Sequence, residues 1–319
     1  MSLLPFGEGN RNYAREMAAE QRADKGVTQR PPASALLCID SEDRYTSLND
    51  RYFNVPEIPG NDFRIQKSQP LLYGIFHRVA MTQLQLQYRI PTIVAGVNNQ
   101  FVIYDTGAND YYQVTLPEGY YSATNLAFVV KTLVLALPGN PFPAFDCSYN
   151  SVTAGLSMAC PTVQFALVNV YNPGPFTDAQ QQVWSRTLVT LGASQDNTGA
   201  SNTQFLGSPQ LLFTRYIDIT SSRLAKFQRV KDSDTVLTNK TNHVWRVFMT
   251  APNTRVDPTA TPGPFDICID PNTPKHSMWS IDEAIYELDF QLYDEWGQLI
   301  PWSPTFNTEF QLTLLASES

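Results

Sequence analysis

The feature that most constrains the fold is a stretch, residues 83–90, in which polar and apolar side chains alternate strictly. The apolar members, which would share one face of an extended chain, are Leu84, Leu86, Tyr88 and Ile90. A period of two indicates a β-strand with one buried and one solvated face. Residues 286–293 repeat the pattern, so at least two half-buried strands are predicted, one from each half of the chain.

Further strands are predicted where β-branched and aromatic residues cluster between turn signals. They cover residues 101–104, 111–116, 163–170, 216–220, 244–250, 265–269 and 310–315. Eight or more antiparallel strands with long loops favour an all-β protein built as a sandwich of two antiparallel sheets, either a jelly roll or an immunoglobulin-like fold. The Cys–Trp–Cys spacing of the immunoglobulin fold is missing, so a single jelly-roll β-sandwich is favoured.

Two short helices interrupt the strands. Ser122 is a good N-cap for the first, whose apolar residues keep helical spacing until Pro138. The second begins with a capping-box pattern, Thr177 to Gln180, and ends at Gly192. Both helices are expected to pack over loops of the sandwich.

The first part of the chain differs from the rest. Residues 11–30 are mostly charged or polar, and Tyr13 and Met17 are their only large apolar pair. So little apolar surface does not offset the entropy lost on ordering a chain. Residues 1–35 are therefore predicted to be a flexible, extended N-terminal arm, either a tail without a role or a segment that orders against a partner, and residues 36–319 the jelly-roll domain.

The charge balance and the spacing of the cysteines limit which partners and ligands the chain is expected to bind. The chain has 22 basic and 30 acidic residues, a net charge of −8, which argues against direct nucleic-acid binding. The four cysteines are far apart in sequence, so buried, reduced thiols are favoured over a disulfide or a metal site. No apolar run is long enough for a transmembrane segment, and the amino terminus lacks the apolar core of a signal peptide. We expect synthesis in the cytoplasm.

No pattern for catalysis, cofactor binding or metal binding emerges. The phosphate-binding glycine loop, the zinc-binding H-E-x-x-H and the G-x-S-x-G nucleophile motif are missing. His77 lies in an apolar stretch, which favours a structural histidine over a general base. Glu287 and Asp289 would share the solvated face of one strand, whereas glycosidases place two carboxylates across a cleft. The chain is therefore interpreted as a protein without enzymatic activity, cofactor or metal.

Three stretches carry a resemblance to a known group of proteins. They are residues 37–45 (LCIDSEDRY), residues 114–127 (VTLPEGYYSATNLA), and residues 288–300 (LDFQLYDEWGQLI) followed by 310–315 (FQLTLL). Together and in this order they resemble the single jelly-roll penton and minor capsid proteins of large eukaryotic DNA viruses, virophages and polinton-like viruses. The resemblance spans residues 36–316. It departs from the family pattern at Glu42, where a basic residue is common.

This resemblance implies a structural virion protein. A penton subunit would form a homopentamer at the fivefold vertex of an icosahedral capsid, in contact with the major capsid protein and minor capsid proteins. A minor capsid or cement protein between major capsomers is the alternative. A carbohydrate-binding sandwich, with Trp245, Trp279, Trp296 and Trp302 as candidate sugar contacts, is an alternative of another class.

Six residues are expected to mediate contacts of the arm and of its exit from the domain: Arg11, Tyr13, Arg15, Asp40, Asp43 and Arg44. The first three lie in the arm and would reach neighbouring subunits. The last three would form an ion pair that holds the arm's exit. An exposed pair contributes only about 0–1 kcal/mol, so its role would be geometric.

Overall fold

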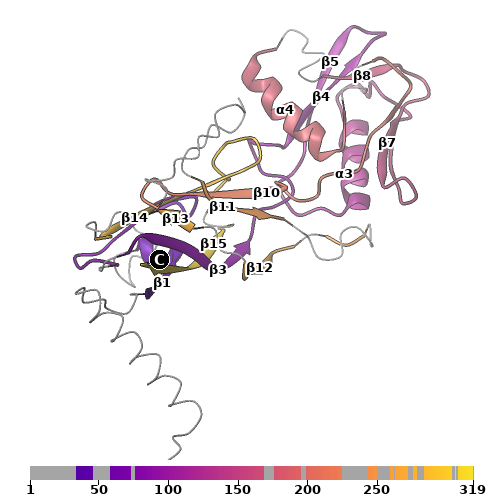
Figure 1. The fold of residues 1–319 in the computed structure, drawn as a ribbon. Helices are drawn as coiled ribbons and strands as arrows, with labels where there is room; N and C mark the ends of the chain where they lie inside the picture. Colours follow the sequence, from indigo (N-terminus) through magenta and orange to yellow (C-terminus); the bar gives the residue numbers. More distant parts are fainter. Residues whose placement is uncertain are drawn as a thin grey trace, which may run out of the picture.

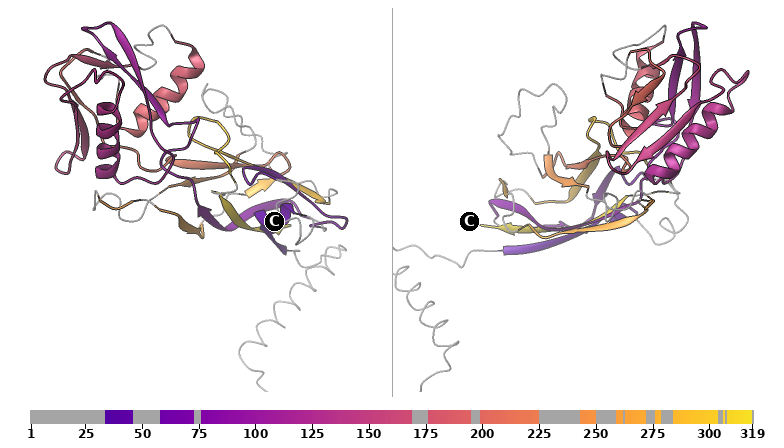
Figure 2. Two further views of the ribbon diagram at one scale, coloured as in Figure 1. Left: turned by 180° about the vertical axis from the view of Figure 1, so that it is seen from behind. Right: turned by 90° about the vertical axis from the view of Figure 1, so that its right-hand side faces the viewer.

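The computed structural model describes residues 34–45, 58–72, 76–168, 176–194, 199–224, 243–249, 259–261, 263–271, 276–278, 284–303, 306 and 308–318. These residues form two lobes (Figure 1), which remain distinct from behind and from the side (Figure 2). The lobe with two larger sheets is called the two-sheet body. The other lobe is formed by residues 99–211, which lie between two successive strands of the two-sheet body. We call it the inserted lobe.

The first sheet of the two-sheet body brings the two ends of the described chain together. Its strand order is β1 (Ser34–Asp40), β15 (Glu309–Ser317), β3 (Arg78–Tyr88) and β12 (Phe265–Ile269), and β13 (His276–Met278) pairs with the other end of β3. All of these pairs are antiparallel.

The second sheet is also antiparallel. Its order is β11 (His243–Phe248), β10 (Tyr216–Thr220), β14 (Glu287–Tyr293) and β2 (Asp62–Gln66). The alternation along β14 is realised as expected, because Leu288, Phe290 and Leu292 are fully buried while the residues between them are half-buried.

The main hydrophobic core contains the inward-facing side chains of both sheets. Leu84, Leu86 and Tyr88 of β3 are fully buried in it, as their alternation predicts. Phe63, Phe290 and Phe310 form a ring cluster with centroid separations of 5.4–5.7 Å. Burying one such side chain contributes roughly 1.5–3 kcal/mol relative to exposure, so this core is a major stabilising element.

The inserted lobe has two three-stranded sheets and two helices. The first sheet contains β4 (Gln100–Asp105), β5 (Asp110–Thr115) and β8 (Phe165–Leu167); the second contains β6 (Asp146–Asn150), β7 (Gly155–Ala159) and β9 (Thr203–Phe205). The helices are α3 (Ala123–Leu135), which packs on β6, and α4 (Asp178–Thr190), which packs on β4. A second hydrophobic core, separate from the first, lies between these elements.

Several local predictions are confirmed. Ser122 accepts a hydrogen bond from the Asn125 backbone and caps α3, and Thr177 and Gln180 form the expected capping box of α4. Gly192 follows α4 with a positive φ of 85°, the left-handed conformation that ends many helices. The fold is mostly β with antiparallel sheets, as the alternation indicates.

Two expectations about arrangement are wrong. The predicted strands at 101–104, 111–116 and 163–170 do not join the two larger sheets but form a sheet of the inserted lobe. The two helices pack on strands of that lobe rather than over loops. The reason is that alternation reports which face of a strand is buried and not which core buries it.

Candidate functional site

The stretch at residues 37–45 forms β1 and the short 3-10 helix η1 (Ser41–Arg44). Asp40 caps this helix, because its side chain accepts a hydrogen bond from the Glu42 backbone at 2.9 Å. The Asp43 carboxylate in turn accepts a hydrogen bond from the backbone amide of Asp40, which completes a capping box. The two aspartates thus turn the chain sharply at the end of β1.

Arg44 is buried, with 4% of its surface exposed. Its guanidinium donates to the carbonyl of Ser41 at 2.7 Å and to that of Ile58 at 3.2 Å. It also lies 3.6 Å from the Glu309 carboxylate and stacks over the Tyr45 ring. Arg44 therefore joins the end of β1 to the start of β15.

These contacts differ from the expectation that Asp40, Asp43 and Arg44 form an ion pair with one another. Arg44 pairs with Glu309, Asp43 pairs with Lys67 at 3.6 Å, and Asp40 accepts a hydrogen bond from Gln311 at 2.7 Å. The three residues do lie together at the end of β1, but each bonds to a different segment. Glu309 and Gln311 could not be found from the sequence, because they lie more than 260 residues away.

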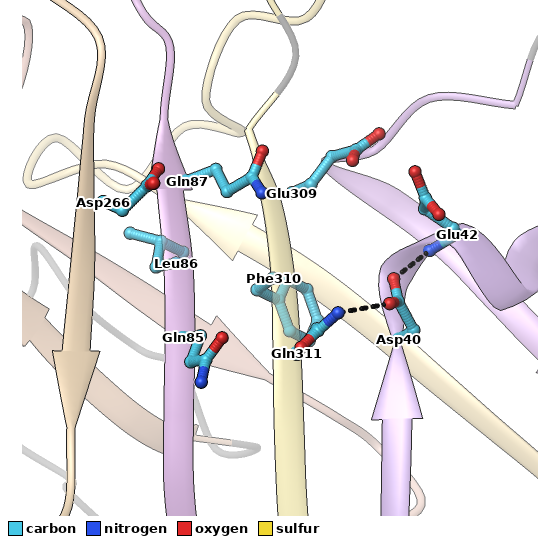
Figure 3. A pocket seen from close by; sticks show the side chains of 9 residues that line it. All are labelled: Asp40, Glu42, Gln85, Leu86, Gln87, Asp266, Glu309, Phe310 and Gln311. Carbon is cyan, nitrogen blue, oxygen red and sulfur yellow. Dashed lines mark hydrogen bonds between the residues drawn. The ribbon is translucent and has the colours of Figure 1, made fainter.

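A polar groove of about 240 Å³ opens beside this turn on the outer face of the first sheet (Figure 3). Its floor consists of residues from β3 and β15, and four carboxylates surround it, those of Asp40, Glu42, Asp266 and Glu309. Burial and the neighbouring charge of Glu42 raise the pKa of Glu309. The lining of the groove thus contains four acidic residues and no basic one, and we call it the acidic groove. Among the described residues, Arg44 lies 3.6 Å from Glu309 and Arg89 lies 3.6 Å from Asp266.

Arg11, Tyr13 and Arg15 lie outside the described residues. Their proposed contacts with neighbouring subunits therefore remain a prediction from the sequence.

The third motif stretch forms β14, a tight turn and the segment that leads to β15. Within the turn, Asp294 is fully buried and accepts bonds from the backbone amides of Trp296 and Gln298 at 2.9 and 2.8 Å. Arg186 of α4 reaches this carboxylate at 3.0 Å, and its guanidinium carbon lies 5.4 Å from the centre of the Trp296 ring. A helix of the inserted lobe is thereby fixed to a turn of the two-sheet body.

A second ion pair lies at the same junction. Arg215 contacts Glu295 at 2.6 Å, and Gln210 donates to the other oxygen of that carboxylate at 3.1 Å. Burial raises the pKa of Asp294, although Arg186 and the backbone amides act in the opposite direction. We call Arg186, Gln210, Arg215, Asp294, Glu295 and Trp296 the lobe junction. The sequence gave no signal for Arg186, which lies in the other lobe.

The residues considered for chemistry have structural partners instead. Asp289 accepts bonds from Ser221 and from the backbone amides of Ser222 and Arg223, and the backbone bonds and Ser222 lower its pKa against the raising effect of burial. Glu287 pairs with Arg64 at 3.2 Å. Within the described ranges, no group of three or more His, Cys, Asp or Glu side chains could hold a metal ion.

The tryptophans do not line a common sugar site in the part of the chain that the structure describes. Trp245 packs against the main core, Trp296 belongs to the lobe junction, Trp302 has a buried indole nitrogen, and Trp279 lies outside the described residues. The acidic groove contains Phe310 as its aromatic member. Among the described helices, none is long and apolar enough to cross a membrane.

Comparisons with known proteins find a likeness in solved structures and none in sequence. No protein-family model and no curated protein matches the sequence. A similar solved structure is the crystal structure of the selenomethionine-labelled mavirus penton protein, with 13% sequence identity and a TM-score of 0.44 over 90% of this chain and 99% of that chain.

Proposed function

We propose that the two-sheet body is a single jelly roll. Its strands pair in a nested order, β1 with β15, β2 with β14, β3 with β12 and β10 with β11. This is the order obtained when one long antiparallel hairpin is rolled up so that its two arms form two sheets. The inserted lobe then occupies the connection between the third and fourth strands of the roll.

On this basis we propose that the protein is a structural subunit of a virus capsid and has no enzymatic activity. The observation that carries the proposal is the nested pairing, because it supplies the scaffold that the three motif stretches imply. Two of these stretches are neighbours in that scaffold, since β1 of the first pairs along its whole length with β15 of the third. The remaining stretch runs from β5 to α3 in the inserted lobe.

More specifically, we propose the penton, a homopentamer at the fivefold vertex, in contact with major and minor capsid proteins of the virion. A ring requires two different faces on each copy that fit one another. The outer faces of the two sheets differ in this way: the first is rich in glutamine with an acidic groove, and the second carries Arg64, Arg223 and Arg246 paired to carboxylates. A minor capsid protein between capsomers is the alternative position.

The test is the mass of the purified chain by light scattering, followed by averaged electron images. Five copies in a closed ring are the expected result. A strict monomer at all concentrations, also in the presence of the major capsid protein, would contradict the penton.

The arm provides a second test of the same proposal. Deleting residues 1–33, which ends immediately before β1, is expected to leave the thermal unfolding of the described domain unchanged and to prevent incorporation into shells. Normal incorporation of the truncated chain would show that the arm is not needed for assembly.

A further inference from the structure

Strand β1 forms one edge of the first sheet. Among the described strands it pairs with β15, in seven consecutive register positions without a shift. An edge strand presents a row of backbone N–H and C=O groups that another strand can pair with. Folded proteins commonly protect such an edge with charged residues, proline or a bulge.

β1 lacks these protections over residues 34–39, which are uncharged and contain no proline. Leu36, at the middle of its outer face, is 67% exposed, and Cys38 two residues on is exposed as well. Other edges are protected: β2 carries Asp62 and Arg64, and the pairing of β10 with β11 contains a register shift. The edge of β1 is therefore suited to strand addition.

The charges around β1 restrict which kind of strand can pair with its edge. The acidic groove opens at the end of β1 where Asp40 and Glu42 are found, and Glu309 and Asp266 lie on the same outer face (Figure 3). A strand that pairs with β1 would therefore be uncharged along Leu36 and Cys38 and basic where it passes Asp40. Opposite charges at such a position steer association and fix the register.

We infer that the edge of β1 that no described strand covers, together with the adjacent acidic groove, receives the N-terminal segment, residues 1–33, of a second copy of this chain. This inference rests on the proposed assembly and names the surface that the arm occupies. Within the segment, residues 22–30 carry Arg22, Lys25 and Arg30 against a single acid, Asp24. Val27 and Thr28 between them favour an extended backbone.

The sequence also disfavours pairing of β1 with its own arm. Pro31 and Pro32 lie three and two residues before Ser34, where a tight hairpin would need a turn with positive φ angles. Proline fixes φ near −65°, so it cannot supply such a turn. A segment of 33 residues can extend roughly 110 Å, which is enough to reach a neighbouring copy.

Cross-linking of the full-length chain tests the inference. In a Cys268→Ser background, Thr28→Cys places one thiol in the arm, and Cys38 supplies the thiol on β1. Cys147 and Cys160 are buried. Treatment of the oligomer with a short bis-maleimide is expected to give covalent dimers and larger products on denaturing gels, and Cys38→Ser should remove them. As a matched control, Val152→Cys in place of Thr28→Cys puts a thiol at a residue of the inserted lobe that is 92% exposed, and it should give no cross-linked products through Cys38.

A second pair of variants tests the edge itself. Leu36→Lys adds a charge to the middle of β1 and is expected to lower the cross-linked fraction about tenfold. Phe248→Lys, at a residue 66% exposed on edge strand β11, is the control and should leave the fraction unchanged. Equal effects of the two variants would overturn the assignment to β1.

The outcomes separate this inference from the proposed function. A ring of five that gives no cross-link between copies through Cys38 would overturn the inference and leave the penton intact. If the chain is monomeric, a fluorescent peptide of residues 1–33 is titrated with the full-length chain. Saturable binding weakened by Leu36→Lys supports the docking surface without the ring, and the lack of such binding overturns it.

Discussion

At the scale of single residues, two buried arginines connect segments that are distant in the sequence. Arg44 joins the turn after β1 to Glu309, and Arg186 joins α4 to Asp294. Both also lie over aromatic rings, those of Tyr45 and Trp296. A guanidinium suits such positions because it is weakly hydrated, planar and able to donate several hydrogen bonds at once.

Arg186→Met is expected to destabilise the protein by about 3–5 kcal/mol, because it leaves the carboxylate of Asp294 buried without its cation. The measurement is chemical denaturation followed by tryptophan fluorescence. Lys67→Met is the control: it breaks the pair with Asp43, in which both side chains are nearly half exposed, and should cost about 0–1 kcal/mol.

The loss caused by Arg186→Met should depend on pH. Burial already raises the pKa of Asp294 above its usual value, and removing the arginine raises it further. The folded chain therefore takes up the proton before the unfolded chain as the pH falls. We expect the full loss near neutral pH and a smaller loss at about pH 4; a pH-independent loss would mean that Asp294 is not its source.

Thiol reactivity should distinguish two classes of cysteine. Cys38 and Cys268 are exposed, whereas Cys147 and Cys160 are buried, and burial raises the pKa of Cys147 to about 12. Because the thiolate is the reactive form, two thiols should react rapidly with a disulfide reagent at mildly alkaline pH and two only on unfolding. Cys38→Ser and Cys268→Ser should each remove one rapidly reacting thiol per chain. Rapid reaction of the Cys147 thiol would contradict its burial in β6.

At the scale of elements, the end of α4 depends on a close backbone crossing. The amide of Gly207 donates to the carbonyl of Gly192 at 2.6 Å, and a Cβ on Gly192 would collide with the backbone of Gly207. Gly192→Ala therefore combines an unfavourable positive φ with a backbone clash, and we expect a loss of several kcal/mol in unfolding experiments.

Gly139→Ala is the matched control for this position. Gly139 has a similar φ of 76°, but a Cβ there would meet no atom within 4 Å. Only the conformational cost remains, about 1 kcal/mol. Equal losses for the two variants would show that the crossing with Gly207 does not constrain α4.

The sequence predicted elements with a clear period or cap. Strands β10 and β12 have the expected bounds, and both helix caps lie at the expected residues. Strands β6 and β7 were missed, because their short sequences DCSYN and GLSMA are rich in small and polar residues without a long alternating run. β6 is stabilised by packing on α3 and β7 by pairing with β6, which are tertiary effects.

The candidate site was predicted less completely than the fold class. Asp40, Asp43 and Arg44 do lie at one turn, but their partners Gln311, Lys67 and Glu309 come from other strands or segments. Local sequence reports which residues are charged and not which distant charge each one meets. The nested pairing of strands could not be predicted for the same reason, because it depends on contacts between residues almost a whole chain length apart.

At the scale of the whole molecule, the inserted lobe has its own core and enters and leaves the two-sheet body at one place. The hydroxyl of Thr92 donates to the carbonyl of Leu211 at 2.7 Å, so the two connections lie side by side. A lobe attached in this way can be removed without stretching the strands that flank it.

Replacing residues 99–210 with a short Gly-Ser linker, together with Asp294→Asn, is therefore expected to leave a folded two-sheet body. Both described α-helices lie in the removed segment, so the far-ultraviolet circular dichroism should lose its α-helical component. Denaturation should remain cooperative. A broad, non-cooperative transition would show that the two-sheet body needs the inserted lobe to fold.

The pairing of β1 with β15 also determines the order in which the protein can mature during translation. The hydrophobic core of the inserted lobe is made of side chains from residues 93–211, so this core can form while later residues are still being synthesised. The two-sheet body cannot close until residues 309–317 have left the ribosome, because β15 lies between β1 and β3. Until that moment the inner faces of β1 and β3 remain open, and they close last because contacts between distant residues form slowly.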